Sequence, residues 1–227
     1  MKKLGLIFCA AVMLSACKQP VKQETPNFDK LLDNYYEDRL KLFPLEATAT
    51  GDNRYNNVLP NDGSAQFIAE AKKFYLTYID QLKTIKREEL DEQDKLSYDV
   101  LSYQTAVQLD AYKYPFEQMP FNQMFSLPLT IGQYGSGSSA QPFKTVKDYD
   151  NWLKRLSAFA IWADTAIVNF NKGVKSGVVM PRSLVVKMIP QMESMVVTDA
   201  TKSLFYEPVK KFPKDFSAII YKANQIK

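Results

Sequence analysis

One long apolar stripe constrains the fold of this chain more than any other feature of its sequence. Between Tyr149 and Val174 the apolar residues recur at alternating spacings of four and three positions. This spacing is typical of an α-helix that buries one face against its neighbours. Thr145, with Asp148 three residues later, predicts the start of the helix, and Gly177 predicts its end. The buried seam is expected to comprise Tyr149, Leu153, Leu156, Ala160, Ala163, Ile167, Phe170 and Val174, widened by Trp152, Phe159 and Ala166.

Helical spacing recurs along most of the chain and predicts an all-α fold of about five to six helices. Pro44 is expected to end the first helix, and Pro190 to kink or end the fifth. The third helix, which Pro115 stops, is expected to bury an apolar stripe. That stripe comprises Leu96, Val100, Tyr103, Val107, Ala111 and Tyr114. The helical patterns are expected to begin near Phe28, Ser64, Asp91, Thr145, Pro181 and Phe216.

Two segments lack a clear helical pattern. Residues 45–60 are expected to be mostly loop. Residues 116–142 hold three prolines, several glycines and a serine cluster, and an irregular segment of this length is usually functional or mobile. Its apolar residues, Met119 and Met124 among them, predict that the first half packs against the rest of the protein.

The amino terminus has the layout of a bacterial lipoprotein signal peptide. Lys2 and Lys3 precede an apolar stretch of 11 residues that ends at Leu14. This stretch is too short to span a bilayer, which needs about 20 apolar residues. Residues 14–17 (Leu-Ser-Ala-Cys) look like a lipobox, which predicts cleavage before Cys17 and acylation of that cysteine, palmitate included. The alternative is an ordinary export signal with an incidental cysteine.

These features divide the chain into three parts. Residues 1–16 are the predicted signal peptide, residues 17–26 a flexible tether, and residues 27–227 a helical domain. Lipid on Cys17 would anchor the protein to a membrane surface. The signal resembles those of enterobacterial lipoproteins. In that group, lipoproteins that have Asp directly after the acylated cysteine stay in the inner membrane. Lys18 therefore favours the outer membrane, with the protein on its periplasmic face.

The chain contains no histidine, which excludes the commonest catalytic and metal-binding arrangements. Nucleophile activation by His, histidine zinc sites and His acid–base catalysis are all ruled out. Cys9 leaves with the signal and Cys17 would be acylated, so thiol chemistry is excluded as well. The acidic residues around Glu37 and around Glu92 fit a solvated helix face and a helix start, rather than a carboxylate pair for glycan cleavage. We predict no catalytic and no metal-binding residue.

The charge balance argues against a nucleic-acid partner. The net charge is +4, and Lys2 and Lys3 of the predicted signal peptide contribute half of it. No stripe of basic residues of the kind that binds phosphates is present.

Four segments resemble, in order and spacing, the bacterial family called domain of unknown function 885. The first is the helix that begins near Phe28, followed by residues 43–55 (FPLEATATGDNRY). The second is residues 94–101 (DKLSYDVL) and the third is residues 142–156 (PFKTVKDYDNWLKRL). The fourth is residues 173–187, which contain GVVMPR. The resemblance covers about residues 27–215. Its family-motif residues are Gly51, Asp52, Arg54, Tyr55, Pro181 and Arg182.

The resemblance implies a largely helical protein from a zinc-peptidase-like group that acts on short peptides. Such proteins run to roughly twice this length or more. Their metal motif, a His-Glu pair followed closely by Pro-Gly-His, lies in the half that follows this region. No catalytic residue can be carried over, because the chain has no histidine. Zinc is implied for full-length members, and no cofactor is expected in this chain.

The sequence thus predicts a lipid-anchored module equivalent to the front half of such a protein, which walls the substrate channel and is not catalytic alone. Its expected partners are the membrane surface, short peptides, and the missing carboxy-terminal half if that is encoded separately. An apolar pattern that runs from Phe216 to Ile226, one residue before Lys227, agrees with an incomplete domain. The alternative is a self-standing helical lipoprotein that binds a peptide or a protein partner.

Overall fold

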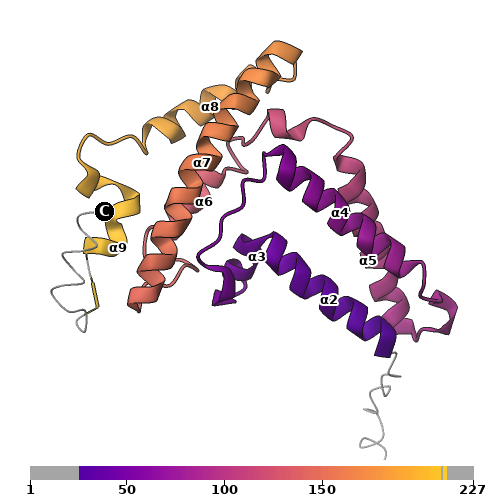
Figure 1. The fold of residues 1–227 in the computed structure, drawn as a ribbon. Coiled ribbons are helices and arrows are strands. Elements are labelled where there is room, and N and C mark those ends of the chain that lie inside the picture. The colour runs from indigo at the N-terminus through magenta and orange to yellow at the C-terminus, as the bar shows by residue number, and fades with distance from the viewer. Residues whose placement is uncertain (1–25, 211, 214–227) are drawn as a thin grey trace, which may run out of the picture.

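The part of the chain that the structure describes folds into helices joined by short turns. The structure, a computed structural model, describes residues 26–210, 212 and 213. Within this range it contains the α-helices α2 to α9, five short 3-10 helices and no strand (Figure 1). The predicted all-α fold is therefore confirmed. Within the same range, no helix combines the length and the hydropathy that crossing a bilayer requires.

The first half of the fold is a group of three packed helices. These are α2 (Pro26–Leu42), α4 (Ala65–Leu82) and α5 (Glu92–Ala111). The expected helix starts are confirmed by their caps, since Ser64 Oγ accepts the Phe67 N–H at 3.1 Å and Asp91 Oδ1 accepts the Asp94 N–H at 2.8 Å. Their shared core comprises Phe28, Leu31, Tyr78, Leu82, Leu90 and Leu101.

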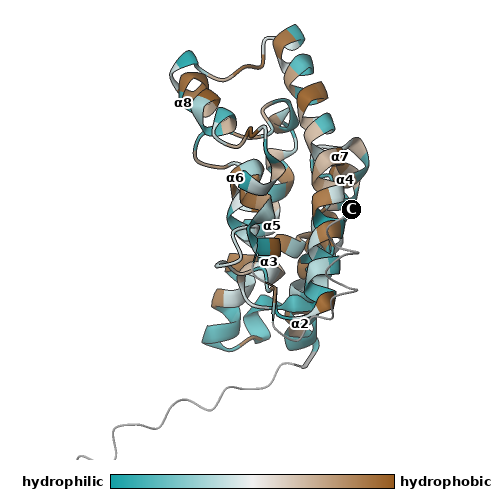
Figure 2. Ribbon diagram, turned by 90° about the vertical axis from the view of Figure 1, so that its left-hand side faces the viewer, coloured by the Kyte–Doolittle hydropathy of each residue, from teal (hydrophilic) through white to brown (hydrophobic). Residues whose placement is uncertain are grey.

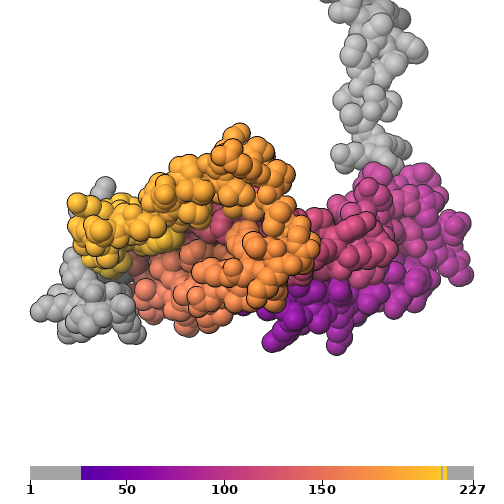
Figure 3. Space-filling model, turned by 90° about the horizontal axis from the view of Figure 1, so that it is seen from above, coloured from indigo at the N-terminus to yellow at the C-terminus, as the bar shows by residue number. Residues whose placement is uncertain are grey.

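The second half is built around one long helix. Its α-helices are α6 (Leu127–Tyr134), α7 (Val146–Ser176), α8 (Arg182–Glu193) and the short α9 (Glu207–Lys210). Both predicted ends of α7 are confirmed, because Thr145 and Asp148 form a reciprocal capping box and Gly177 closes the helix with a φ of 81°. Its core contains Leu59, Ile131, Tyr134 and Trp152. Seen from above, the two halves occupy opposite ends of an elongated surface (Figure 3).

Short helices occupy both segments that were expected to lack them. In residues 45–60 these are α3 (Pro44–Ala49) and the 3-10 helix η1 (Asn53–Tyr55). In residues 116–142 they are the 3-10 helix η3 (Phe116–Gln118) and α6. Proline is the first residue of α3 and the second residue of α6, positions in the first turn where its missing N–H has no helical partner. Helices this short contain too few residues to show an apolar stripe, so the loop predictions were wrong at these places.

Helix α8 also differs from its prediction near both ends. It begins at Arg182, with Pro181 as the residue before it, and it runs past Pro190 to Glu193. Pro190 removes only one backbone N–H close to the end of the helix, where few hydrogen bonds remain to be lost. The prediction was that Pro190 kinks or ends this helix, and the second outcome is wrong because α8 continues for three more residues.

The buried face of α7 is rotated relative to the predicted seam. The predicted seam residues Ile167 and Val174 are 60% and 70% exposed. The widening positions Trp152 and Ala166 are buried as expected. The observed buried line includes polar side chains, and it comprises Tyr149, Trp152, Arg155, Trp162, Ala166, Asn169 and Gly173.

The apolar stripe predicted to be buried on α5 instead faces outward. Tyr103, for example, is 72% exposed, and Leu96, Val100, Val107 and Tyr114 are also exposed. The inner face contains Asp94, Leu101 and Thr105. Packing against α2 and α4 decides which face of α5 is buried, and an apolar pattern alone does not fix that choice. We call Leu96, Val100, Tyr103 and Val107 the α5 stripe, and Tyr114 lies three residues beyond the end of the helix.

Four predictions fall on residues that the structure does not describe. The signal peptide and the acylated Cys17 lie within residues 1–25, and so does nearly all of the tether. The helical pattern that begins near Phe216 lies within residues 214–227. These predictions stand as they were made from the sequence.

Candidate functional site

A buried arginine on α7 holds the segment of the chain that connects α2 to α4. Arg155 is fully buried. Its Nε donates to the Val58 carbonyl at 3.1 Å, and its Nη2 donates to Thr48 Oγ1 at 2.8 Å and to the Tyr55 carbonyl at 3.2 Å. Nη1 donates to Gln141 Oε1. Burial lowers the pKa of Arg155 to about 10, which still leaves the guanidinium charged at neutral pH.

Three further side chains of α7 bind the turn that precedes α4. Together with Arg155 they hold residues 58–63, and we call the four side chains the α7 clamp. An irregular segment needs partners for its backbone groups, and polar side chains supply them. This is why the buried face of α7 is not uniformly apolar. The contacts are Trp162 Nε1 to Asp62 Oδ1 at 2.6 Å, Asn61 Nδ2 to Thr165 Oγ1 at 2.7 Å, and Asn169 Nδ2 to the Gly63 carbonyl at 2.9 Å.

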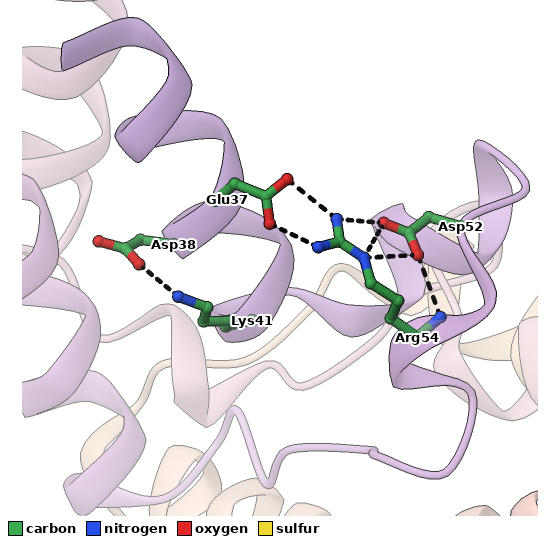
Figure 4. Close-up of polar contacts among 5 residues, drawn as sticks. All are labelled: Glu37, Asp38, Lys41, Asp52 and Arg54. Carbon is green, nitrogen blue, oxygen red and sulfur yellow. Dashed lines mark hydrogen bonds and ion pairs between the residues drawn. The ribbon is translucent and has the colours of Figure 1, made fainter. Parts of the chain in front are cut away.

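Four of the family-motif residues form one charged turn beside α2 (Figure 4). Gly51 has a φ of 86°, a left-handed conformation that favours glycine. Arg54 then reaches back to Asp52 at 2.6 Å and across to Glu37 on α2 at 2.7 Å. Hydrogen bonds from Arg54 lower the pKa values of both the Glu37 and the Asp52 carboxyl groups. Tyr55 links the turn to the α7 clamp through its carbonyl.

This turn has a structural explanation that needs no ligand. Its charges satisfy one another, and they fix the path of the chain between α3 and the clamped segment. Asp38 and Lys41 form a second ion pair on the same helix at 2.9 Å (Figure 4). The remaining family-motif residues, Pro181 and Arg182, lie elsewhere, at the start of α8. The structure therefore does not gather the six family-motif residues into one site.

An apolar groove lies between η3, the end of α7, and α8. Its volume is about 400 Å³. Figure 2 shows hydrophobic segments along the helices that form it. Methionine side chains are flexible and polarizable, so a wall of this kind adapts to differently shaped apolar partners. We call it the methionine groove, and its wall includes Met119, Phe170, Met180, Val185, Met188 and Met192.

A glycine sets the close approach that forms this groove. A Cβ atom at Gly173 would lie 2.5 Å from the Val178 carbonyl oxygen and 2.8 Å from that of Gln118. Only glycine allows η3 and the turn after α7 to pack this tightly on the helix. Ser176 Oγ then donates to Gln118 Oε1 across the same junction. Sequence reasoning missed the groove, because its methionines are spread over three separate segments.

A second cavity is also bordered by η3 and differs in chemistry. It has a volume of about 290 Å³ and is lined by five aromatic residues and two carboxylates. Burial of the Asp62 carboxyl raises its pKa, although the residue as a whole is exposed. Burial also raises the pKa of Tyr112 to about 12. We call this the aromatic cavity, and the residues are Phe43, Phe67, Tyr112, Tyr114, Phe116, Asp62 and Glu117.

The described residues hold no cluster of three or more His, Cys, Asp or Glu side chains placed for a metal ion. The methionine groove and the aromatic cavity are two of the cavities in this part of the chain, and they differ in the ligands that they suit. The methionine groove suits an apolar group, and the aromatic cavity is both aromatic and acidic.

Comparison with known proteins identifies the family. No curated protein and no solved structure matches the chain. The model of a family described as bacterial protein of unknown function (DUF885) matches residues 44–226. The match begins at Pro44, so it excludes α2, and it extends beyond residue 215, where the resemblance was expected to stop. Because it covers far more than half of the chain, this protein belongs to the DUF885 family.

Proposed function

We propose that this chain is a lipid-anchored helical module of the cell envelope that binds short peptides through the methionine groove. The groove itself is the observation that carries this proposal. Ligand sites are typically concave and mostly apolar, with a few polar groups at defined positions. Gln118 and Glu193 supply such groups beside the methionine side chains.

The groove suits one apolar side chain of an extended peptide. Its volume of about 400 Å³ is at the small end of the range of ligand sites, roughly 300–1,000 Å³. Methionine-lined surfaces accept several apolar partners because their side chains repack. The family-resembling segment at Val179 and Met180 forms part of the wall, which ties the groove to the part of the chain that resembles the family.

Binding is tested with labelled pentapeptides that differ at one position. Ala-Ala-Leu-Ala-Ala should bind more tightly than Ala-Ala-Asp-Ala-Ala, as measured by fluorescence anisotropy. Val185→Lys places a charge in the groove and should weaken binding of the leucine peptide by about tenfold or more. Val186→Lys is the matched control, because Val186 is the next residue on α8, is also exposed and does not line the groove. Equal binding of both peptides, or equal effects of the two substitutions, would refute the proposal.

The same module would form the substrate wall of a zinc-peptidase-like protein whose metal motif lies in a carboxy-terminal half. The α5 stripe supports this part of the proposal, since a run of exposed apolar side chains on one helix marks a surface for further protein. Co-purification with the carboxy-terminal half of a DUF885 relative tests it. Tyr103→Lys should abolish the association, whereas Tyr36→Lys, at an aromatic residue that is also exposed but lies on α2, should not.

A self-standing peptide-binding lipoprotein is the alternative, and the α5 stripe would then receive a separate protein. Lack of any association with the carboxy-terminal half, together with peptide binding in the groove, would favour this alternative. In either case the chain alone should neither hydrolyse dipeptides nor retain zinc after dialysis. Stoichiometric zinc would contradict both versions.

Anchoring is tested independently of binding. Labelled palmitate should enter the wild-type chain in its native host and should not enter Cys17→Ser. Fractionation should then place the acylated protein in the outer membrane. Equal labelling of the two chains would refute acylation of Cys17 and, with it, the proposed membrane anchoring.

A further inference from the structure

The two carboxylates of the aromatic cavity lack the partners that other acidic residues have. Glu37, Asp52 and Asp99 each form an ion pair with an arginine at 2.7 Å or less. Within the described residues, Asp62 and Glu117 form no ion pair with a lysine or an arginine. A negative charge beside aromatic rings, without a cation of its own, is electrostatically costly.

Asp62 is nevertheless held firmly in place. Its Oδ1 accepts the Trp162 indole N–H at 2.6 Å, and the backbone N–H of Gly63 also donates to the carboxyl. These bonds come from the α7 clamp and from the turn before α4. The carboxylate is therefore positioned by two separate parts of the fold, as an acceptor for a ligand should be.

The aromatic walls of the cavity also favour a positively charged ligand. Phe43 and Phe67 pack edge to face, with ring centroids 5.9 Å apart. Tyr114 and Phe116 lie 6.0 Å apart, and both are 59% exposed. The faces of aromatic rings attract cations within about 6 Å of the centroid. The ring of Tyr112 already attracts a cation in this way, because Lys72 Nζ lies 5.7 Å from its centroid.

We propose that the aromatic cavity is a binding site for an alkylammonium group, which Asp62 and Glu117 pair with and the aromatic side chains surround. This site is separate from the methionine groove, although both have η3 as a wall. Ammonium is favoured because its N–H groups can satisfy two carboxylates while its carbon chain contacts the rings. The group could belong to a free amine or to the side chain of a lysine in a peptide.

The indole N–H of Trp162 is a natural reporter of the site. The chain has two tryptophans, and Trp152 packs in the second core, away from the cavity lining. Titration of the purified full chain with n-butylammonium should shift the ¹⁵N–¹H indole resonance of Trp162 in a saturable way. The resonance of Trp152, assigned through Trp152→Phe, should stay in place. n-Butanol, which has the same length and no charge, should not reproduce the shift.

Two substitutions test the carboxylates separately. Asp62→Asn and Glu117→Gln should each weaken butylammonium binding by about tenfold, since each removes one charge-assisted hydrogen bond. Glu88→Gln, an exposed acid outside the cavity, should leave binding unchanged. Far-ultraviolet circular dichroism checks that each variant is folded, and Glu117→Gln keeps the test decisive if Asp62→Asn loosens the clamp. Equal binding of butanol, or full affinity in Glu117→Gln, would overturn the proposal.

The source of the ammonium group is resolved by one further titration. Acetyl-Gly-Lys-Gly-amide presents the same alkylammonium on a peptide backbone. Tighter binding than butylammonium assigns the site to a lysine side chain, and weaker binding assigns it to a free amine. Either result supports the ammonium site, whereas no shift with either compound contradicts it.

Discussion

Helices α5 and α7 carry similar apolar patterns but bury them differently. In α7 the buried face lies next to the apolar stripe and includes Arg155 and Asn169, whose polar groups hold the segment before α4. In α5 the apolar stripe faces outward, and the buried face includes Asp94 and Thr105. An apolar repeat thus indicates that a helix forms. It does not indicate which face meets the protein interior, because that depends on what the neighbouring segments need.

The largest loss of stability is expected when Arg155, the charged side chain of the α7 clamp, is replaced. Arg155→Met keeps much of the side-chain volume but leaves the Val58 and Tyr55 carbonyls without their partner. Unfolding by urea should show a loss of about 3–5 kcal/mol. Lys154→Met, at the exposed neighbouring position, should change the stability by no more than about 0.5 kcal/mol. A small effect of Arg155→Met would mean that the clamp does not hold the segment that connects α2 to α4.

Adjacent residues of α5 provide the matching test for its two faces. Leu101 is buried in the first core, and Val100 belongs to the exposed stripe. Leu101→Ala should cost about 2–4 kcal/mol because it leaves a cavity, whereas Val100→Ala should cost roughly 0.5 kcal/mol or less. Thermal unfolding of the two variants measures this difference. Similar losses of stability in the two variants would show that the α5 stripe is buried in solution, which would contradict the structure.

A third substitution tests the close packing at the end of α7. Gly173→Ala places a methyl group against two carbonyl oxygens, so η3 must move away from the helix. The expected loss is about 1–3 kcal/mol, together with weaker peptide binding in the methionine groove. Lys175→Ala is the control, because Lys175 lies in the same last turn of α7, is exposed and does not line the groove. Unchanged stability and binding in Gly173→Ala would contradict the predicted contact with η3.

The smallest effect should come from the exposed charges outside the clamp. Arg54 lowers the pKa values of Glu37 and Asp52 in the folded protein. Their contribution to stability is therefore present above the unfolded-state pKa values of about 4 and is lost as the pH falls through the lower folded-state values. Arg54→Ala should destabilise the protein slightly at pH 7, and the difference from wild type should vanish near pH 2.

A matched arginine controls for general charge effects. Arg182 is the other family-motif arginine and is exposed at the start of α8. Arg182→Ala should leave the pH dependence of stability as it is in the wild type. The measurement is a series of urea unfolding curves between pH 2 and pH 7. A constant difference for Arg54→Ala across this range would exclude the ion pairs as its cause.

The helix starts could be read from the sequence because they depend on local chemistry. Ser64, Asp91 and Thr145 each accept a hydrogen bond from a residue three positions later, and this requires nothing from the rest of the fold. The same is true of Gly177, whose left-handed conformation ends α7. Local signals were therefore sufficient to place the starts of α4, α5 and α7 and the end of α7.

The two cavities could not be read from the sequence, for a different physical reason. Each is built from three or more segments that are distant along the chain. The aromatic cavity, for example, joins Phe43, Asp62, Tyr112 and Glu117. Nothing in the local pattern around Asp62 distinguishes it from an ordinary turn residue. Only the approach of Trp162 from α7 fixes its carboxylate, and that approach depends on the clamp.

The α7 clamp also has a consequence for the order in which the chain folds. The hydrogen bonds from the clamp to residues 58–63 join residues that are 97 to 106 positions apart in the sequence. Closing a loop of that length is entropically unfavourable, and non-local contacts of this kind slow the folding of a domain. Helices α4 and α5, which are neighbours in the chain and pack on each other, can associate much earlier. We therefore expect the α2–α4–α5 group to form first, and the arrival of α7 to be the slow step that completes the protein.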